Sequence, residues 1–153
     1  MEHTALIYTM VLVSASDGHM KDAELRTMGD IVRTIPAFRG YTSDFLPMAA
    51  KDCADMLNEK DGLDKVLTFI DRSLPPELRE TAYAIACEIA VADGKLEQEE
   101  LRLLEMIRHR LGVGRLPAAA IERGVKARYT PFNKNAGGAK KAAKAKAAKA
   151  KRR

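Results

Sequence analysis

The chain has 153 residues, enough for one domain with a single hydrophobic core. Hydrophobic residues make up 46% of it and charged residues 31%, as in ordinary soluble globular proteins, but aromatic residues make up only 5% and Trp is absent. Aliphatic residues must therefore fill the core, which favours helices over sheets. Two cysteines without a CxxC motif exclude a disulfide scaffold and a finger-type zinc site, so we expect a cytoplasmic protein.

Helix signals recur along the chain, and strand signals are almost absent. An apolar run over 4–16, too short to span a membrane, predicts a first helix with one apolar side (Leu6, Ile7, Met10, Val11) that Gly18 ends. The second predicted helix has a seam at Leu25, Met28, Val32 and Ile35, and the sixth has one at Leu101, Leu104, Ile107 and Leu111. After the first, the predicted helices are, in chain order, 21–35, 43–58 with Ser43 as N-cap, 63–72, 75–92, 98–111 and 117–126. We expect an all-α fold, a single compact array of six or seven helices.

The net charge of +5 hides two oppositely charged regions. Residues 134–153 contain seven Lys, two Arg and no acidic residue, whereas residues 1–110 contain 13 basic and 20 acidic residues. The predicted organisation is a helical domain over 1–132 and a basic tail over 133–153. Rich in Lys and Ala and with nothing to bury, the tail is expected to be largely disordered.

One segment of the sequence occurs twice, 76 residues apart. Residues 17–31 (DGHMKDAELRTMGDI) align with residues 93–107 (DGKLEQEELRLLEMI), sharing Asp-Gly at the start and Glu-Leu-Arg seven residues later. Each copy lies between two predicted helices. A duplicated helix-turn-helix unit is the economical explanation.

The repeated turn contains half of a calcium-binding loop. An EF-hand has Gly at position 6, a bidentate Glu at position 12 and an oxygen ligand at position 5, and here Asp17, Gly18 and Glu24, like Asp93, Gly94 and Glu100, have that spacing. Positions 1 and 3 have no side-chain oxygen, which excludes a complete EF-hand. Two interpretations stay open: a weak site for a hard divalent cation, or helix punctuation by a Gly C-cap and a Glu in a first helical turn.

With these paired turns, and with the motif ADGK at 92–95, the chain resembles the TerB tellurite-resistance family over about 4–128. The TerB domain is itself similar to the N-terminal region of a membrane-anchored DnaJ-like co-chaperone. The resemblance implies an all-helical domain, a link to tellurite and general stress resistance, and a divalent-cation site at the acidic turns. By that likeness the site residues are Asp17, Glu24, Asp93 and Glu100.

The sequence departs from that pattern at the residue three before each motif Glu. The family often has Ser or Thr there, as in a capping box, whereas this chain has Lys21 and Glu97. Lys21 weakens the first turn as a cation site, and Glu97 strengthens the second as a further candidate ligand. His19 is the other additional candidate, although a solvent-facing turn histidine is the simpler interpretation.

No residue constellation predicts catalysis. The three histidines lack a sequence-level partner, the cysteines lie among apolar neighbours where buried thiols are expected, and phosphate loops, nucleophile elbows and dinucleotide fingerprints do not occur. We therefore expect a non-enzymatic stress-response interaction module, with a divalent cation of unknown identity, no organic cofactor, no small-molecule substrate and an unidentified protein partner.

The alternative function class is binding through the tail. Its cations would neutralise phosphates of nucleic acid without sequence preference, or attract an anionic membrane surface. The residues that would do so are Lys140, Lys141, Lys144, Lys146, Lys149, Lys151, Arg152 and Arg153.

Overall fold

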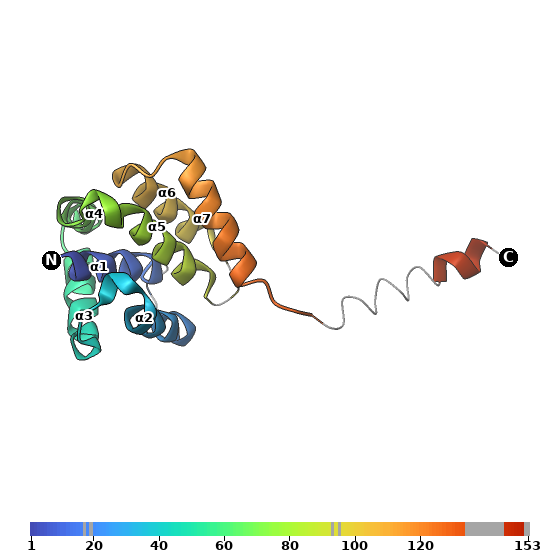
Figure 1. Cartoon of the computed structure of the whole chain (residues 1–153), viewed down its shortest axis with the longest axis horizontal. Helices are drawn as coiled ribbons and strands as arrows, with labels where there is room; N and C mark the ends of the chain where they lie inside the picture. Colours follow the sequence, from blue (N-terminus) through green and yellow to red (C-terminus); the bar gives the residue numbers. More distant parts are fainter. Residues whose placement is uncertain (17, 19, 93, 95, 134–145, 152–153) are drawn as a thin grey trace.

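The structure is a computed structural model that describes residues 1–16, 18, 20–92, 94, 96–133 and 146–151. The described part is all-helical and contains no strand, which confirms the predicted fold class (Figure 1). Its elements are α1 (Glu2–Ser14), α2 (Asp22–Thr34), two 3-10 turns η1 (Pro36–Phe38) and η2 (Ser43–Phe45), α3 (Leu46–Leu57), α4 (Gly62–Ser73), α5 (Pro76–Val91), α6 (Gln98–Arg110) and α7 (Arg115–Arg128).

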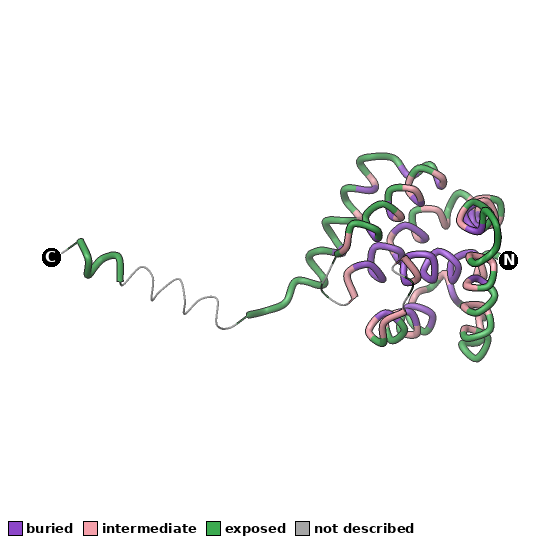
Figure 2. The backbone as a smooth tube through the Cα atoms, turned by 180° about the vertical axis from the view of Figure 1, so that it is seen from behind, coloured by how far each residue is buried: buried purple, intermediate pink, exposed green. Residues whose placement is uncertain are grey.

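Helix α1 is the centre of the core. Every residue from Ala5 to Ser14 is buried, and α1 packs against α3, α4, α5 and α6 (Figure 2). The prediction of one apolar side was wrong, because a helix that is apolar all round is buried all round. Helix α5 is the second buried helix, with a continuous buried run from Ile85 to Ala90.

The two sequence repeats pack against each other. The first repeat is α1, its turn and α2, and the second is α5, its turn and α6. The central helices α1 and α5 are in contact, α2 packs on α5 of the other repeat, and α6 packs both on its own α5 and on α1 of the other repeat. These contacts between the repeats bring the starts of α2 and α6 to neighbouring positions.

Two further sequence predictions failed in detail. Ser43 does not cap α3, because it begins the 3-10 turn η2, and Phe45 precedes the helix, whose first turn contains Pro47. Leu25 and Leu101, predicted in core-facing seams, are 45% and 42% exposed. Both lie in the first turn of their helices, where the neighbouring residues Glu24 and Glu100 occupy the buried side. Met28 and Leu104, further along, are the buried apolar residues of the seams.

Helix α7 packs along α5 and leads out of the domain (Figure 1). Ala118 and Val125 face α5, Tyr83 donates a 2.6 Å hydrogen bond to Glu122, and Arg128 pairs with the nearly buried Glu88 at 2.8 Å. Residues 146–151 form an exposed helical turn, as the helix preference of alanine allows. Residues 134–145 and 152–153 of the predicted tail, which include Lys140, Lys141, Lys144, Arg152 and Arg153, lie outside the described residues.

Candidate functional site

The predicted cation site is only partly described by the structure. Glu24, Glu97 and Glu100 are described, whereas Asp17, Asp93 and the additional candidate His19 lie outside the described residues. Within the described part of the chain, no three His, Cys, Asp or Glu side chains come together in a way that could hold a metal ion.

The two repeated turns have the same backbone geometry. Gly18 and Gly94 both have left-handed backbones, with φ of +81° and +76°. Each glycine N–H donates a 3.0 Å hydrogen bond to a carbonyl three residues earlier, that of Ala15 in the first turn and of Val91 in the second. The two glycines therefore have equivalent conformations in the two turns. Neither is the C-cap of its helix, because α1 ends at Ser14 with Ala15 as C-cap and α5 ends at Val91 with Ala92 as C-cap, so the prediction that Gly18 ends the first helix was wrong in position.

Glu24 and Glu100 occupy equivalent buried positions. Each is 2% exposed, although carboxylates are rarely buried so deeply. Glu24 Oε2 accepts the Lys21 backbone N–H at 2.9 Å, and Glu100 Oε2 accepts that of Glu97 at 3.2 Å. These bonds are the carboxylate half of a capping box, which persists without a Ser or Thr at the N-cap.

An ion pair joins the two repeats at their turns. Lys21 Nζ, at the N-cap of α2, lies 3.7 Å from Glu97 Oε1, at the N-cap of α6. Both side chains are partly exposed, at 30% and 43%. Two acidic turns 76 residues apart in sequence are therefore neighbours in space, a relation that sequence reasoning left open.

The donor chemistry around the turns fits a hard cation. Two buried carboxylates, those of Glu24 and Glu100, are oxygen donors of the kind that Mg²⁺, Ca²⁺ and Mn²⁺ prefer. Ser14, in the last turn of α1, adds a buried hydroxyl with no hydrogen-bond partner in the part of the chain that the structure describes. Lys21 opposes cation binding because its ammonium group already supplies positive charge.

The family comparison agrees with the duplicated turns. The family model described as tellurite resistance protein TerB matches residues 3–123, which include both turns and most of α7. The chain belongs to the TerB family. The comparisons with curated proteins and with solved structures gave no match. The end of α7 and all of the basic tail lie beyond the matched region of the TerB domain.

The two cysteines of the TerB domain lie in buried surroundings that disfavour a reactive thiolate. Cys53 is fully buried and Cys87 is 4% exposed, as expected from the sequence. Burial raises the pKa of each thiol to about 12, so the nucleophilic thiolate is scarce at neutral pH. The thiols therefore offer no support for direct redox chemistry on an oxyanion such as tellurite.

The two described histidines, His3 and His109, have neighbours that give no indication of catalysis. His3 stacks on Phe38 with ring centroids 5.7 Å apart, and its Nε2 lies 2.9 Å from the carbonyl oxygen of Ala37. His109 is exposed on α6, with Nε2 3.8 Å from a carboxylate oxygen of Glu105. His109 lines a shallow pocket with Arg102, Glu105 and Arg110, and no Ser, Thr or Cys is among the described residues that line it.

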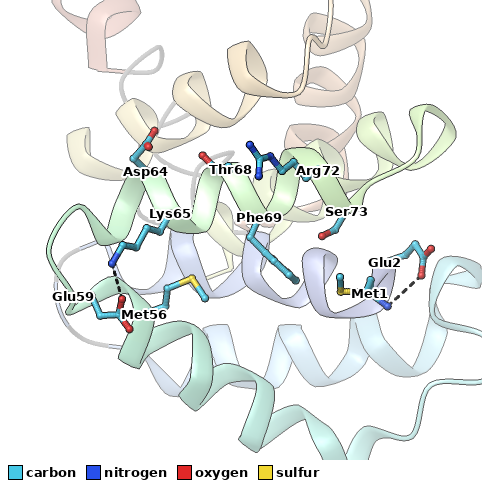
Figure 3. Close-up of a pocket in the computed structure, with 10 residues that line it drawn as sticks. All are labelled: Met1, Glu2, Met56, Glu59, Asp64, Lys65, Thr68, Phe69, Arg72 and Ser73. Atoms are coloured by element: carbon cyan, nitrogen blue, oxygen red, sulfur yellow. Dashed lines mark hydrogen bonds and ion pairs between the residues drawn. The ribbon is translucent and has the colours of Figure 1, made fainter.

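An open pocket of about 710 Å³ lies between the start of α1, the end of α3 and α4 (Figure 3). Two ion pairs lie within it, between Lys65 and Glu59 at 2.7 Å and between the terminal amine of Met1 and Glu2 at 3.3 Å. Asp64, which also lines it, pairs with Arg110 outside the pocket at 2.7 Å. No residue of the repeated turns lines it. The pocket therefore does not add to the candidate cation site.

None of the described helices is long and apolar enough to cross a membrane.

Proposed function

We propose that this TerB-family chain is a non-enzymatic stress-response interaction module of the cytoplasm whose conformation responds to a divalent cation at the paired acidic turns. The contact between Lys21 and Glu97 carries the proposal, because it brings the turns of both repeats within reach of one another. Asp17, Glu24, Asp93 and Glu100 are the proposed ligands, with Glu97 and His19 as further candidates.

The contacts between the two repeats supply a route from cation to conformation. Helix α2 begins at the first turn and packs on α5, while α6 begins at the second turn and packs on α1. A cation held by both turns would stabilise one arrangement of α2 relative to α6. Any partner that recognises that arrangement would then bind more tightly in the presence of the cation.

The proposed partner is a protein, without an organic cofactor or a small-molecule substrate. The exposed leucines next to the buried glutamates, Leu25 and Leu101, together with Leu96 in the second turn, support this. Apolar side chains beside charged groups are typical of surfaces that bind proteins.

Thermal unfolding of the full chain with Mg²⁺, Ca²⁺, Mn²⁺ and Zn²⁺ tests the proposal. A cation at one hundred times its dissociation constant should stabilise the fold by about 2.7 kcal/mol, which raises the melting temperature by roughly 5–10 °C. The Asp17→Asn, Asp93→Asn double variant should lose this increase. The matched control is Asp22→Asn, Glu99→Gln, which removes the same charge from exposed positions beside the turns. If no cation stabilises the wild type, or if the double variant responds like the control, the cation proposal is wrong.

The segregation of charge supports a second candidate function, binding of nucleic acid or an anionic membrane through the basic tail. The described tail residues Lys146, Lys149 and Lys151 are exposed. Deletion of residues 135–153 should strongly reduce retention on DNA or on anionic vesicles. Retention that is unaltered by the deletion would contradict this candidate.

A further inference from the structure

The outer face of α7 carries three cations, one at the start of the helix and two near its end. At 100° per residue, positions 115, 126 and 123 lie at about 0°, 20° and 80° on a helical wheel, so the three cations share an exposed arc that begins about 60° from the buried residue Ala118. They are Arg115, Arg123 and Lys126, all of them exposed.

These three cations are free to bind an external anion. None of them has an ion pair or a side-chain hydrogen bond with the residues that the structure describes. The two other charged residues of α7 are already engaged toward α5, Glu122 by Tyr83 and Arg128 by Glu88. Glu122, the one carboxylate of the helix, lies beside Arg115 and Lys126 on the wheel, but its Oε1 accepts the hydrogen bond of Tyr83 on α5.

The remaining residues of this face are small. Ala119, Ala120, Gly124 and Ala127 are exposed between the cations, and the bulky Leu116 lies at the start of the helix. An interfacial membrane helix needs a face of bulky apolar side chains to bury among lipids. A face of small residues and cations instead lets a phosphate backbone approach closely, which favours nucleic acid.

The length of the cationic strip formed by Arg115, Arg123 and Lys126 also suits a phosphate backbone. From Arg115 to Lys126 the helix rises about 16 Å, at roughly 1.5 Å per residue. One strand of a duplex presents a phosphate about every 3.4 Å along its axis, so the strip faces about five phosphates. The strip leads into Phe132, which is 87% exposed, and then into the tail with its nine cations.

We propose that the outer face of α7 is a sequence-independent binding surface for the phosphate backbone of duplex nucleic acid, in which Arg115, Arg123 and Lys126 contact phosphates. The proposal gives the folded domain a direct part in nucleic-acid binding. It stands whether or not the acidic turns bind a cation, and it concerns residues other than those of the tail.

Binding of the full chain to a 20-base-pair DNA duplex, measured by fluorescence anisotropy from 50 to 200 mM salt, tests the proposal. In the Arg115→Gln, Arg123→Gln, Lys126→Gln variant, the slope of log affinity against log salt should become shallower by about three units, one for each lost phosphate contact. The matched control is Arg39→Gln, Lys60→Gln, Arg72→Gln, which removes the same charge from exposed positions on other elements. The control should keep the wild-type slope.

A second comparison separates the strip from the tail. The Lys146→Gln, Lys149→Gln, Lys151→Gln variant also removes three charges, and combining it with the α7 substitutions should reduce the slope further if the two regions contact separate phosphates. The proposal is overturned if the α7 variant binds the duplex like the matched control, or if the wild type binds vesicles of anionic lipid but not the duplex. Melting temperatures close to the wild type would show that the exposed substitutions leave the fold intact.

Discussion

At the scale of single residues, replacement by alanine is expected to have opposite effects on stability at Gly94 and at Gly124. Gly94 has φ of +76°, whereas Gly124 lies inside α7, and a Cβ added at either position would meet open space. Gly94→Ala should destabilise the fold by about 1–2 kcal/mol, because a Cβ is disfavoured in the left-handed region. Gly124→Ala should stabilise it by up to about 1 kcal/mol. Urea unfolding measures both, and a stable Gly94→Ala protein would mean that the turn relaxes out of the left-handed conformation.

A second residue-scale prediction concerns Lys21, whose ammonium group lies 3.7 Å from Glu97. If a cation binds at the paired turns, Lys21→Met should tighten its binding about two- to fivefold, because an exposed charge pair of this kind is worth up to about 1 kcal/mol. Lys65→Met is the control, since Lys65 pairs with Glu59 at a distant pocket. Isothermal titration calorimetry measures the dissociation constants, and weaker binding by Lys21→Met would show that Lys21 supports the site.

At the scale of elements, the attachment of α7 to α5 depends on a nearly buried carboxylate. The Glu88 side chain is 9% exposed and pairs with Arg128 at 2.8 Å. Arg128→Met should destabilise the fold by about 1–2 kcal/mol, less than for a fully buried pair because Arg128 itself is 67% exposed. Adding Glu88→Gln should recover much of the loss, since a neutral amide needs no counter-charge. Chemical denaturation of the single and double variants checks this, and a double variant less stable than Arg128→Met would contradict it.

The elements also show what the sequence can predict. Apolar runs, prolines and glycines predicted the helices closely, because local chemistry sets where a helix begins and ends. The exposure of Leu25 and Leu101 and the all-round burial of α1 were missed, since periodicity shows which residues are apolar and not which helices cover them. The sequence also could not predict that the acidic turns are neighbours in space, because this follows from the long-range packing of α1, α2, α5 and α6. The sequence features that bear on this packing are the repeat itself and the unusually apolar first helix.

At the scale of the whole molecule, two buried thiols make the fold sensitive to alkali. Burial raises the pKa of Cys53 and of Cys87 to about 12 from an ordinary value of 9. The unfolded chain therefore loses these protons first, so their contribution to stability is complete below about pH 9 and is lost as the pH rises toward 12. The free energy of unfolding should fall by up to about 1.4 kcal/mol per pH unit for each thiol. The pKa of Tyr83 is also raised, by burial and by its hydrogen bond to Glu122, and acts in the same direction.

Urea unfolding between pH 8 and 11 measures this slope. The Cys53→Ala, Cys87→Ala variant will be less stable at pH 8, because it leaves small cavities, but its stability should fall less steeply with pH. Equal slopes for the variant and the wild type would show that the thiols do not control the alkaline transition.

The contacts between the repeats also bear on the ancestry of the fold. In a symmetric dimer of a single helix-turn-helix unit, the first helix of each subunit would pack on its partner's first helix and also on its partner's second helix. The packing of α1 on α5 and α6, and of α5 on α1 and α2, includes these contacts within one chain, in addition to the contact of α5 with its own α6. A gene duplication that fused two such subunits would place the starts of α2 and α6 near each other, and each copy could then diverge. The lysine at 21 and the glutamate at 97, equivalent positions with opposite charges, are the divergence expected once a twofold axis no longer forces both copies to be identical.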